Sequence, residues 1–378
     1  MALKVYESSA KLAGRFPGAT LDGIAGLLHI VNSYYSNLIE GHNIHPIDIQ
    51  RAMRHDYSAD EDKRDLQLES LIHIEMQKKI IERLAAEPDL NIASAEFLYW
   101  IHGEFYEQMP ERLRWCYGAE GNREWVEAGQ PRKHMVQVGN HIPPVAESIE
   151  DFLRRFEKFY NPSAMRGLRP LIALAAAHHR LMWIHPFLDG NGRVARLFTD
   201  AYFYRISLPG YGLWNVSRGL ARSRDKYRAH LAQANFPREG DLDGRGNLSN
   251  RTLTEFCRYF LESCLDQWEF MNSLLVLNEF LERLEKYVEI RNSGLIVDER
   301  GSKLPPLHSR ASVVLKEVAV KGELTRGEVF RLIEMSERSG RNILKTFLDE
   351  GLLVATSDWH RSPVRLGFPV QAAGYWFP

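Results

Sequence analysis

The sequence of 378 residues is long for one ordinary domain and favours two or three domains, with ample length to bury a core. Hydrophobic residues make up 44% and charged residues 26%, which excludes disordered and collagen-like proteins. The formal net charge of −1 gives no overall preference for nucleic acid or an anionic membrane, so any such contact depends on a local patch.

Cysteine usage and the N-terminus predict the compartment. The sequence has an odd number of cysteines, and their spacing is not that of metal ligands: Cys116, Cys257 and Cys264. This indicates free thiols that pack in the interior of the protein. The N-terminus lacks the apolar core of a signal peptide, and no apolar run approaches the roughly 20 residues that cross a bilayer. We therefore expect a cytoplasmic protein without membrane contacts.

Apolar residues recur at spacings of three and four through most of residues 20–290, which predicts a mainly α-helical fold. The clearest predicted helices cover residues 21–41, 65–87, 148–160, 168–184 and 253–290. Residues 129–148 break this pattern, because Val136 and Val138 alternate before Gly139-Asn140 and a double proline. This segment predicts a short exposed β-hairpin followed by an irregular stretch.

The C-terminal residues have a different character. Residues 291–309 are polar and contain two glycines and two prolines, which predicts a linker. Beyond them, helices are predicted at 311–322, at 324–335 with Thr325 as the N-cap, and at 336–351, ended by Gly351. Two strands around a turn are predicted within 352–369, and three helices with a β-wing make a winged helix.

The stretch WIHPFLDGNGRVARLF concentrates special residues after a predicted helix. His185 precedes Pro186, and proline disfavours helix in the residue before it, so the imidazole is expected at the mouth of a cleft. Taken by itself, this histidine is better explained as an ordinary residue at a helix C-terminus, and its neighbours decide otherwise.

The residues that follow have the pattern of a phosphate site. Gly190 and Gly192 allow a tight backbone path into a predicted helix, whose first amides bind anions well. Arg193 and Arg196 share a face of that helix, and Asp189 supplies an oxygen ligand suited to phosphate-bound Mg²⁺. A hairpin turn fits less well because the flanking residues are helical. An EF-hand loop would need calcium ligands at positions where this sequence has other residues, and a Walker A loop would need a lysine that is missing here.

Residues 185–196 match H-P-F-x-D/E-G-N-G-R-x-x-R at every specified position, and the chain thereby resembles the Fic family. The resemblance implies a helical core that uses ATP and Mg²⁺ to transfer AMP to a Tyr, Ser or Thr hydroxyl of a target protein, and to itself. It implies a general base at His185, a Mg²⁺ ligand at Asp189, an anion cradle at Gly190, Asn191 and Gly192, and terminal-phosphate contacts from Arg193 and Arg196.

Two flanking segments also resemble family features. The first resembles the flap that pairs with target backbone, with its edge at Val136, Gln137, Val138 and Gly139. The second, YRAHLAQAN, resembles the Y-Y-x-x-L-x-x-A-N segment near the adenine, which implies Tyr227 and Asn235 as pocket residues. Arg228 stands where a second tyrosine is usual, and an ordinary amphipathic helix is the alternative.

The stretch SNLIEG, residues 36–41, ends a predicted helix with Gly41 as the C′ residue. A carboxylate in the last helical turn lies against the negative end of the dipole, so Glu40 is either a solvated surface charge or has a cationic partner. The stretch matches S/T-x-x-x-E-G/N, the inhibitory motif of class II Fic proteins. The resemblance implies that Ser36 and Glu40 belong to an autoinhibitory helix, and that Glu40 pairs with Arg196 and denies it to the ATP γ-phosphate.

The predicted domains are an N-terminal helical region at 1–110 with the inhibitory helix, a Fic core at 111–290, a linker at 291–309 and a winged helix at 310–378. The last carries ten Lys or Arg and eight Asp or Glu, a weak basic balance that leaves a protein partner, a homodimer or DNA open. Other transferred groups (UMP or phosphate), AMP removal, and a nucleotide-sensing, DNA-binding regulator remain alternatives.

Overall fold

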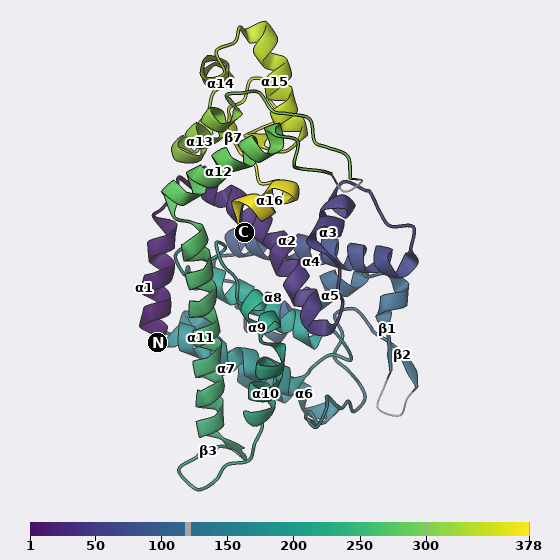
Figure 1. Ribbon diagram of the computed structural model, residues 1–378. Helices are drawn as coiled ribbons and strands as arrows, with labels where there is room; N and C mark the ends of the chain where they lie inside the picture. The colour runs from purple at the N-terminus through teal and green to yellow at the C-terminus, as the bar shows by residue number, and fades with distance from the viewer. Residues whose placement is uncertain (118–121, 299–300, 378) are drawn as a thin grey trace. The chain divides into compact units, whose positions relative to one another are not determined.

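The computed structural model describes residues 1–117, 122–298 and 301–377. They form two compact units (Figure 1). The first comprises Met1–Ser9, His29–Tyr211 and Asn215–Trp268, and the second comprises Ala10–Leu28, Gly212–Trp214 and Glu269–Pro378. This grouping cuts across the predicted domain boundaries, because residues 10–28 and 269–290 pack with the C-terminal residues.

The fold is mainly helical, as predicted. The residues of three helices are divided between the two units, namely those of α1 (Ala2–Ala13), α2 (Gly18–Glu40) and α11 (Asn250–Leu274). The first unit also holds α3 (Pro46–Met53), α4 (Glu61–Ala86), α5 (Ala95–Glu107), α6 (Ile149–Tyr160), α7 (Arg169–Ile184), α8 (Asn191–Arg205), α9 (Val216–Arg222) and α10 (Arg224–Gln233). No helix in the described ranges is long and apolar enough to cross a membrane.

Helix α8 forms the centre of the first unit. Helices α4, α5 and α7 pack against it (Figure 1), and every residue from Arg193 to Phe203 is buried. A helix buried on all sides must pair its polar side chains internally, since an unpaired buried polar group is costly. Asp200, for example, accepts a hydrogen bond from Asn32 of α2 at 2.8 Å, and burial raises its pKa to about 6. This packing fixes the N-terminus of α8, where residues 191–196 of the motif lie.

Short strands add little to the first unit. They are β1 (Trp115–Tyr117) with β2 (Arg123–Trp125), and β3 (Gly244–Arg245) with β4 (Leu248–Ser249), and both pairs are antiparallel. Single 3₁₀ turns lie at Glu111–Arg114, Ala146–Ser148 and Pro162–Ala164. The hairpin predicted within 129–148 is much smaller than expected, because it consists of one antiparallel bridge between Val138 and His141. The Gly139-Asn140 turn is present, but the flanking backbone does not continue the ladder.

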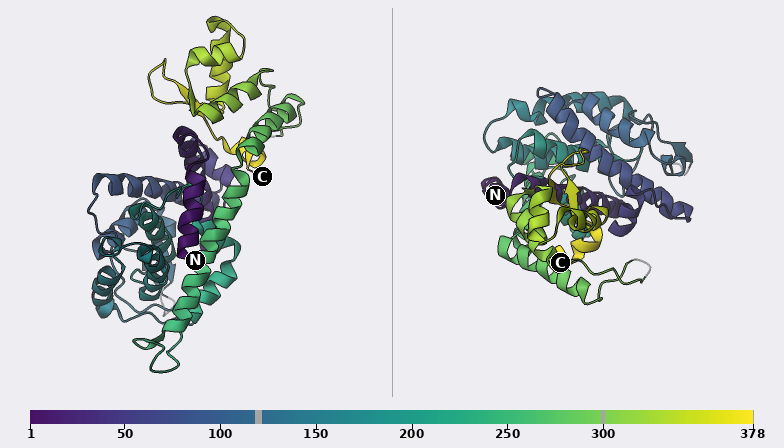
Figure 2. Two further views of the ribbon diagram at one scale, coloured as in Figure 1. Left: turned by 90° about the vertical axis from the view of Figure 1, so that its left-hand side faces the viewer. Right: turned by 90° about the horizontal axis from the view of Figure 1, so that it is seen from above.

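The second unit contains the predicted C-terminal elements (Figure 2). Its helices are α12 (Leu277–Asn292), α13 (Ala311–Lys321), α14 (Arg326–Leu332), α15 (Glu337–Asp349) and α16 (Val370–Trp376). Strands β5 (Glu323–Leu324), β6 (Leu353–Ala355) and β7 (Val364–Leu366) form an antiparallel sheet in the order β5-β7-β6. Thr325 caps α14 in a capping box with Glu328, as its position before the helix predicts. Strand β5 and helix α16 were not predicted.

The single long helix predicted at 253–290 is two helices. Helix α11 ends at Leu274 and α12 begins at Leu277, with Val276 in an extended conformation between them. No glycine or proline marks this break, and the apolar spacing continues across it. The turn therefore depends on packing in the second unit, where Leu275 and Phe280 are fully buried.

Candidate active site

The motif residues form the connection between α7 and the start of α8. His185 follows the last residue of α7 with a left-handed backbone (φ 52°), and Gly190 takes φ 79° immediately before α8. The Asn191 side chain closes this loop by accepting from the Phe187 amide at 2.9 Å and donating to the Phe187 carbonyl at 2.8 Å. The loop is therefore fixed by its own sequence. No side chain caps α8, so its first amides point toward the loop, as anion binding requires.

His185 is held in the geometry of a base. Its Nδ1 lies 3.2 Å from the Met182 carbonyl, and since a carbonyl only accepts, Nδ1 carries the proton and Nε2 is the basic nitrogen. Burial, with smaller contributions from the nearby His141 and Arg132, lowers the pKa of His185 to about 4. The imidazole is therefore neutral at pH 7. Arg132 also donates to the His185 carbonyl at 2.8 Å, which holds the backbone of the loop.

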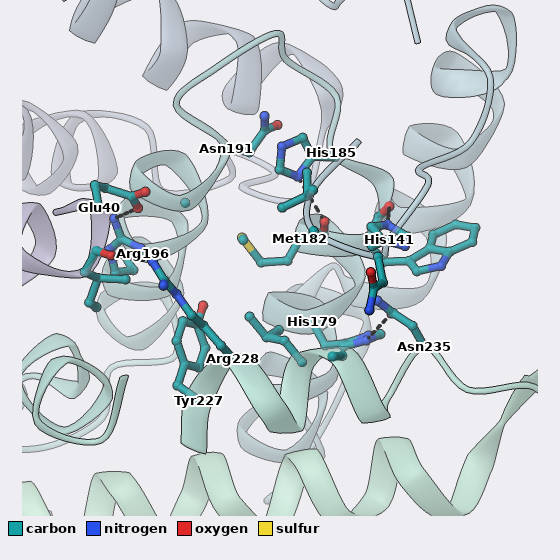
Figure 3. Close-up of a pocket in the computed structure, with 18 of the residues that line it drawn as sticks. Glu40, His141, His179, Met182, His185, Asn191, Arg196, Tyr227, Arg228 and Asn235 are labelled. Carbon is teal, nitrogen blue, oxygen red and sulfur yellow. Dashed lines mark hydrogen bonds and ion pairs between the residues drawn. The ribbon is translucent and has the colours of Figure 1, made fainter. Parts of the chain in front are cut away.

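One cavity of about 830 Å³ contains most of the predicted site (Figure 3). Its volume lies within the range of about 300–1,000 Å³ typical of small-molecule sites. Its lining includes the predicted residues Glu40, Val138, Gly139, His185, Asp189, Gly190, Asn191, Gly192, Arg196, Tyr227 and Asn235. Residues Val136 and Gln137 of the predicted flap are not part of this lining. Three separate segments, near residues 40, 140 and 230, thus surround the motif.

Glu40, the last residue of α2, lies against the first turn of α8, beside Arg196. Its Oε1 accepts a hydrogen bond from Arg196 Nη2 at 2.5 Å (Figure 3), and the arginine is 1% exposed. Arg196 also donates from Nε to the Ser36 hydroxyl at 2.8 Å and from Nη2 to the Ser36 carbonyl at 3.1 Å. A Cβ on Gly192 would lie 2.3 Å from Glu40 Oε1, so only glycine permits this approach. The carboxylate therefore occupies space beside the predicted anion cradle.

Arg193, the other predicted phosphate ligand on α8, is bound to groups of the protein itself. Its guanidinium is buried outside the cavity lining and donates to Glu69 Oε1 at 2.6 Å, to the Tyr106 hydroxyl at 2.7 Å and to Asp189 Oδ2 at 2.9 Å. These three hydrogen bonds tie the arginine to Asp189 and to two other helices, and its contact with a terminal phosphate stays a prediction. Burial alone would raise the pKa of Asp189, but the charge of Arg193 and the hydrogen bond from Tyr106 outweigh it and lower the pKa.

The predicted adenine residues line the cavity, but their polar atoms are bonded to neighbouring histidines. The Tyr227 hydroxyl lies 2.7 Å from His178 Nε2. Asn235 Oδ1 lies 2.9 Å from His179 Nε2 (Figure 3). Arg228, which replaces the second tyrosine, donates to the Ile39 carbonyl at 3.2 Å. The segment thus forms a wall of the cavity and also contacts the end of α2.

Several site residues were missed from the sequence. Tyr106 and His102 lie on α5, which was not predicted, and His102 stacks between Phe187 and Tyr106 with ring centroids at 4.0 and 4.4 Å. Glu69 lies on a predicted helix, but its partner Arg193 is 124 residues away. His141 contacts the Trp183 carbonyl at 2.9 Å and so ties the Val138–His141 bridge to α7. These residues act through distant contacts, which leave no local pattern.

The donor set suits a magnesium ion that arrives with a nucleotide. In the ranges that the structure describes, no group of three or more His, Cys, Asp or Glu residues could hold a metal ion by itself. Asp189 offers one carboxylate that lines the cavity and is 43% exposed. Mg²⁺ is commonly held by one or two carboxylates together with substrate phosphates, so the residues fit the predicted ion.

The sequence and the fold are both similar to known Fic proteins. Residues 90–203 match the Fic/DOC family. Protein adenylyltransferase Fic of Drosophila virilis is 28% identical over 196 residues, 51% of this chain and 36% of that protein. The Drosophila melanogaster protein of the same name is 35% identical over 122 residues, 32% of this chain and 23% of that protein. The chain thus spans little more than a third of one relative and under a quarter of the other.

Two solved structures share the fold. A Fic family protein from Desulfovibrio desulfuricans G20 aligns over 97% of this chain and 95% of its own, with a TM-score of 0.53 and 14% identity. Fic-1 from C. elegans aligns over 72% of each chain, with a TM-score of 0.52 and 16% identity. At such identities the likeness concerns the fold. Residues 90–203 are thus similar in sequence to the Fic/DOC family, and the fold of the chain is similar to that of solved Fic proteins.

Proposed function

We propose that this protein transfers AMP from ATP to a hydroxyl side chain of a target protein. The observation that carries the proposal is that one cavity of about 830 Å³ joins a neutral histidine, the N-terminus of α8 and Arg196. The amides at the start of α8 and the guanidinium of Arg196 suit a triphosphate, and His185 suits a hydroxyl. The names of the Drosophila relatives, protein adenylyltransferase Fic, support the same reaction.

The proposed reaction follows from these positions. The target hydroxyl oxygen attacks the α-phosphorus, and His185 Nε2 takes the hydroxyl proton. The new phosphorus–oxygen bond replaces the bond to the β-phosphate, so pyrophosphate leaves. Arg196 stabilises the terminal phosphates, and Asp189 would hold Mg²⁺, which neutralises phosphate charge when bound. Positioning and electrostatic stabilisation supply most of the rate in such transfers.

We further propose that Glu40 inhibits this reaction. Its ion pair with Arg196 at 2.5 Å, and its contact with Gly192, support competition with an ATP phosphate for the same cation and the same space. Ser36 adds two bonds to Arg196 and so supports the inhibited arrangement.

For the C-terminal residues we propose a winged helix. Helices α13, α14 and α15 with the sheet order β5-β7-β6 support this assignment. Binding of a protein partner, of a second copy or of DNA stays a prediction, as does the cytoplasmic location.

Labelled ATP tests the transferred group. We expect label from the α-phosphate to remain on protein, and label from the γ-phosphate to be released as pyrophosphate. Retention of γ-label would indicate a kinase, and label from UTP alone would indicate UMP transfer. Release of AMP from a modified protein, without transfer, would indicate the reverse reaction. No label from either nucleotide, together with tight DNA binding, would favour the nucleotide-sensing regulator.

The pH dependence tests the role of His185. A base must be neutral, and burial lowers the pKa of His185 to about 4, so activity should be lost only as the pH falls toward that value. We expect kcat/KM for AMP transfer to be nearly constant between about pH 6 and 8, since the free enzyme carries a neutral imidazole throughout. A profile that halves near pH 6.5, the ordinary histidine value, would contradict the buried geometry.

A further inference from the structure

The end of α2 is closed by a Schellman motif. The Gly41 amide donates to the Leu38 carbonyl at 3.1 Å, and the His42 amide donates to the Asn37 carbonyl at 3.0 Å, with Gly41 at φ 97°. Glu40 lies inside the loop that these two bonds close. Its backbone is therefore fixed relative to His42.

The His42 side chain binds a buried carboxylate. His42 Nδ1 lies 2.6 Å from Glu69 Oε2, and the Glu69 side chain on α4 is 0% exposed. The other oxygen of Glu69 accepts from Arg193 Nη1 at 2.6 Å. The hydrogen bond to Glu69 raises the pKa of His42, which favours a charge-assisted bond near neutral pH. The second residue after the helix end in a Schellman motif, here His42, often makes an apolar contact with the helix. In this protein the bond to Glu69 takes the place of that contact.

We propose that His42 is a positioning residue of the inhibitory contact, whose bond to Glu69 holds the end of α2 so that Glu40 stays on Arg196. The inference rests on the proposed inhibition by Glu40. His42 is outside the cavity lining and so acts through Glu40, not on the nucleotide. The inhibitory motif S/T-x-x-x-E-G/N ends at Gly41 and does not include this histidine.

Two substitutions of one residue test the inference. His42→Ala removes the hydrogen-bond donor to Glu69. His42→Asn keeps a donor there, because its amide nitrogen lies close to the position of Nδ1. Glu69 retains Arg193 in both variants, so the buried carboxylate stays paired. We expect AMP transfer by His42→Ala to rise roughly three- to tenfold, the effect of losing one hydrogen bond of ordinary strength from a partly exposed side chain, and His42→Asn to stay near the unsubstituted rate. Amides 40–42 should exchange hydrogen faster in the alanine variant alone.

The same substitution made in a Glu40→Gly variant distinguishes the positioning role of His42 from a general loss of stability. In Glu40→Gly, where inhibition is already removed, adding His42→Ala should give no further rise. The inference is overturned if Glu40→Gly is activated while His42→Ala is not, or if the alanine and asparagine variants are activated equally. If Glu40→Gly itself is not activated, the proposed inhibition fails, and amide exchange alone decides whether His42 holds the helix end. His42→Ser replaces the alanine variant should the latter not fold.

Discussion

Glu40→Gly is expected to raise AMP transfer by roughly tenfold or more, whereas most substitutions at an enzyme site lower activity. The substitution frees Arg196, which is 1% exposed and bound to the carboxylate at 2.5 Å. Breaking a partly buried ion pair changes free energies by about a few kcal/mol, and each 1.4 kcal/mol is about tenfold in rate or occupancy. It also empties the space beside Gly192 that the Glu40 carboxylate occupies. Initial rates of labelling from α-labelled ATP measure the gain.

The double variant Glu40→Gly, Arg196→Ala is the control. The gain depends on the released guanidinium, so removing that group should abolish it, and the two effects should not add. Equal or lower transfer by Glu40→Gly, with ATP binding intact, would show that residues 36–41 are an ordinary helix end.

His185→Ala is expected to lower AMP transfer by about 10²–10⁴-fold, the usual effect of removing a general base. The measurement is best made in the Glu40→Gly background, where the rate to be lost is larger. ATP affinity, measured by titration calorimetry, should stay nearly unchanged, because the α8 amides and Arg196 bind the phosphates and the histidine acts on the incoming hydroxyl. The loss should therefore appear in kcat.

His360→Ala supplies a matched control, since this exposed histidine lies on the turn between β6 and β7 and outside the cavity lining. It should transfer AMP at the unsubstituted rate. Turnover near that rate in His185→Ala would rule out the proposed base, and a large loss of ATP affinity would mean that the imidazole binds nucleotide.

The sequence by itself determined the features that depend on neighbouring residues. Pro186 ends α7, so His185 leaves the helix as predicted, and Gly190 permits the left-handed step that begins α8. Gly41 ends α2 in the same local way. The apolar spacing of three and four predicted most helices of the core. The pairing of Glu40 with Arg196 was expected only from the family motif, because nothing in either segment specifies the other.

Only the tertiary structure decided which charges meet. Arg193 and Arg196 share one face of α8 in sequence, yet Arg196 lines the cavity while Arg193 is held by Glu69 and Tyr106 from α4 and α5. The difference arises because a buried guanidinium is stable only beside acceptors, and those acceptors come from distant helices. The anchor of His42 on Glu69 has the same origin. Periodicity and turn residues report local backbone preferences, whereas ion pairs between separate helices depend on how the helices pack.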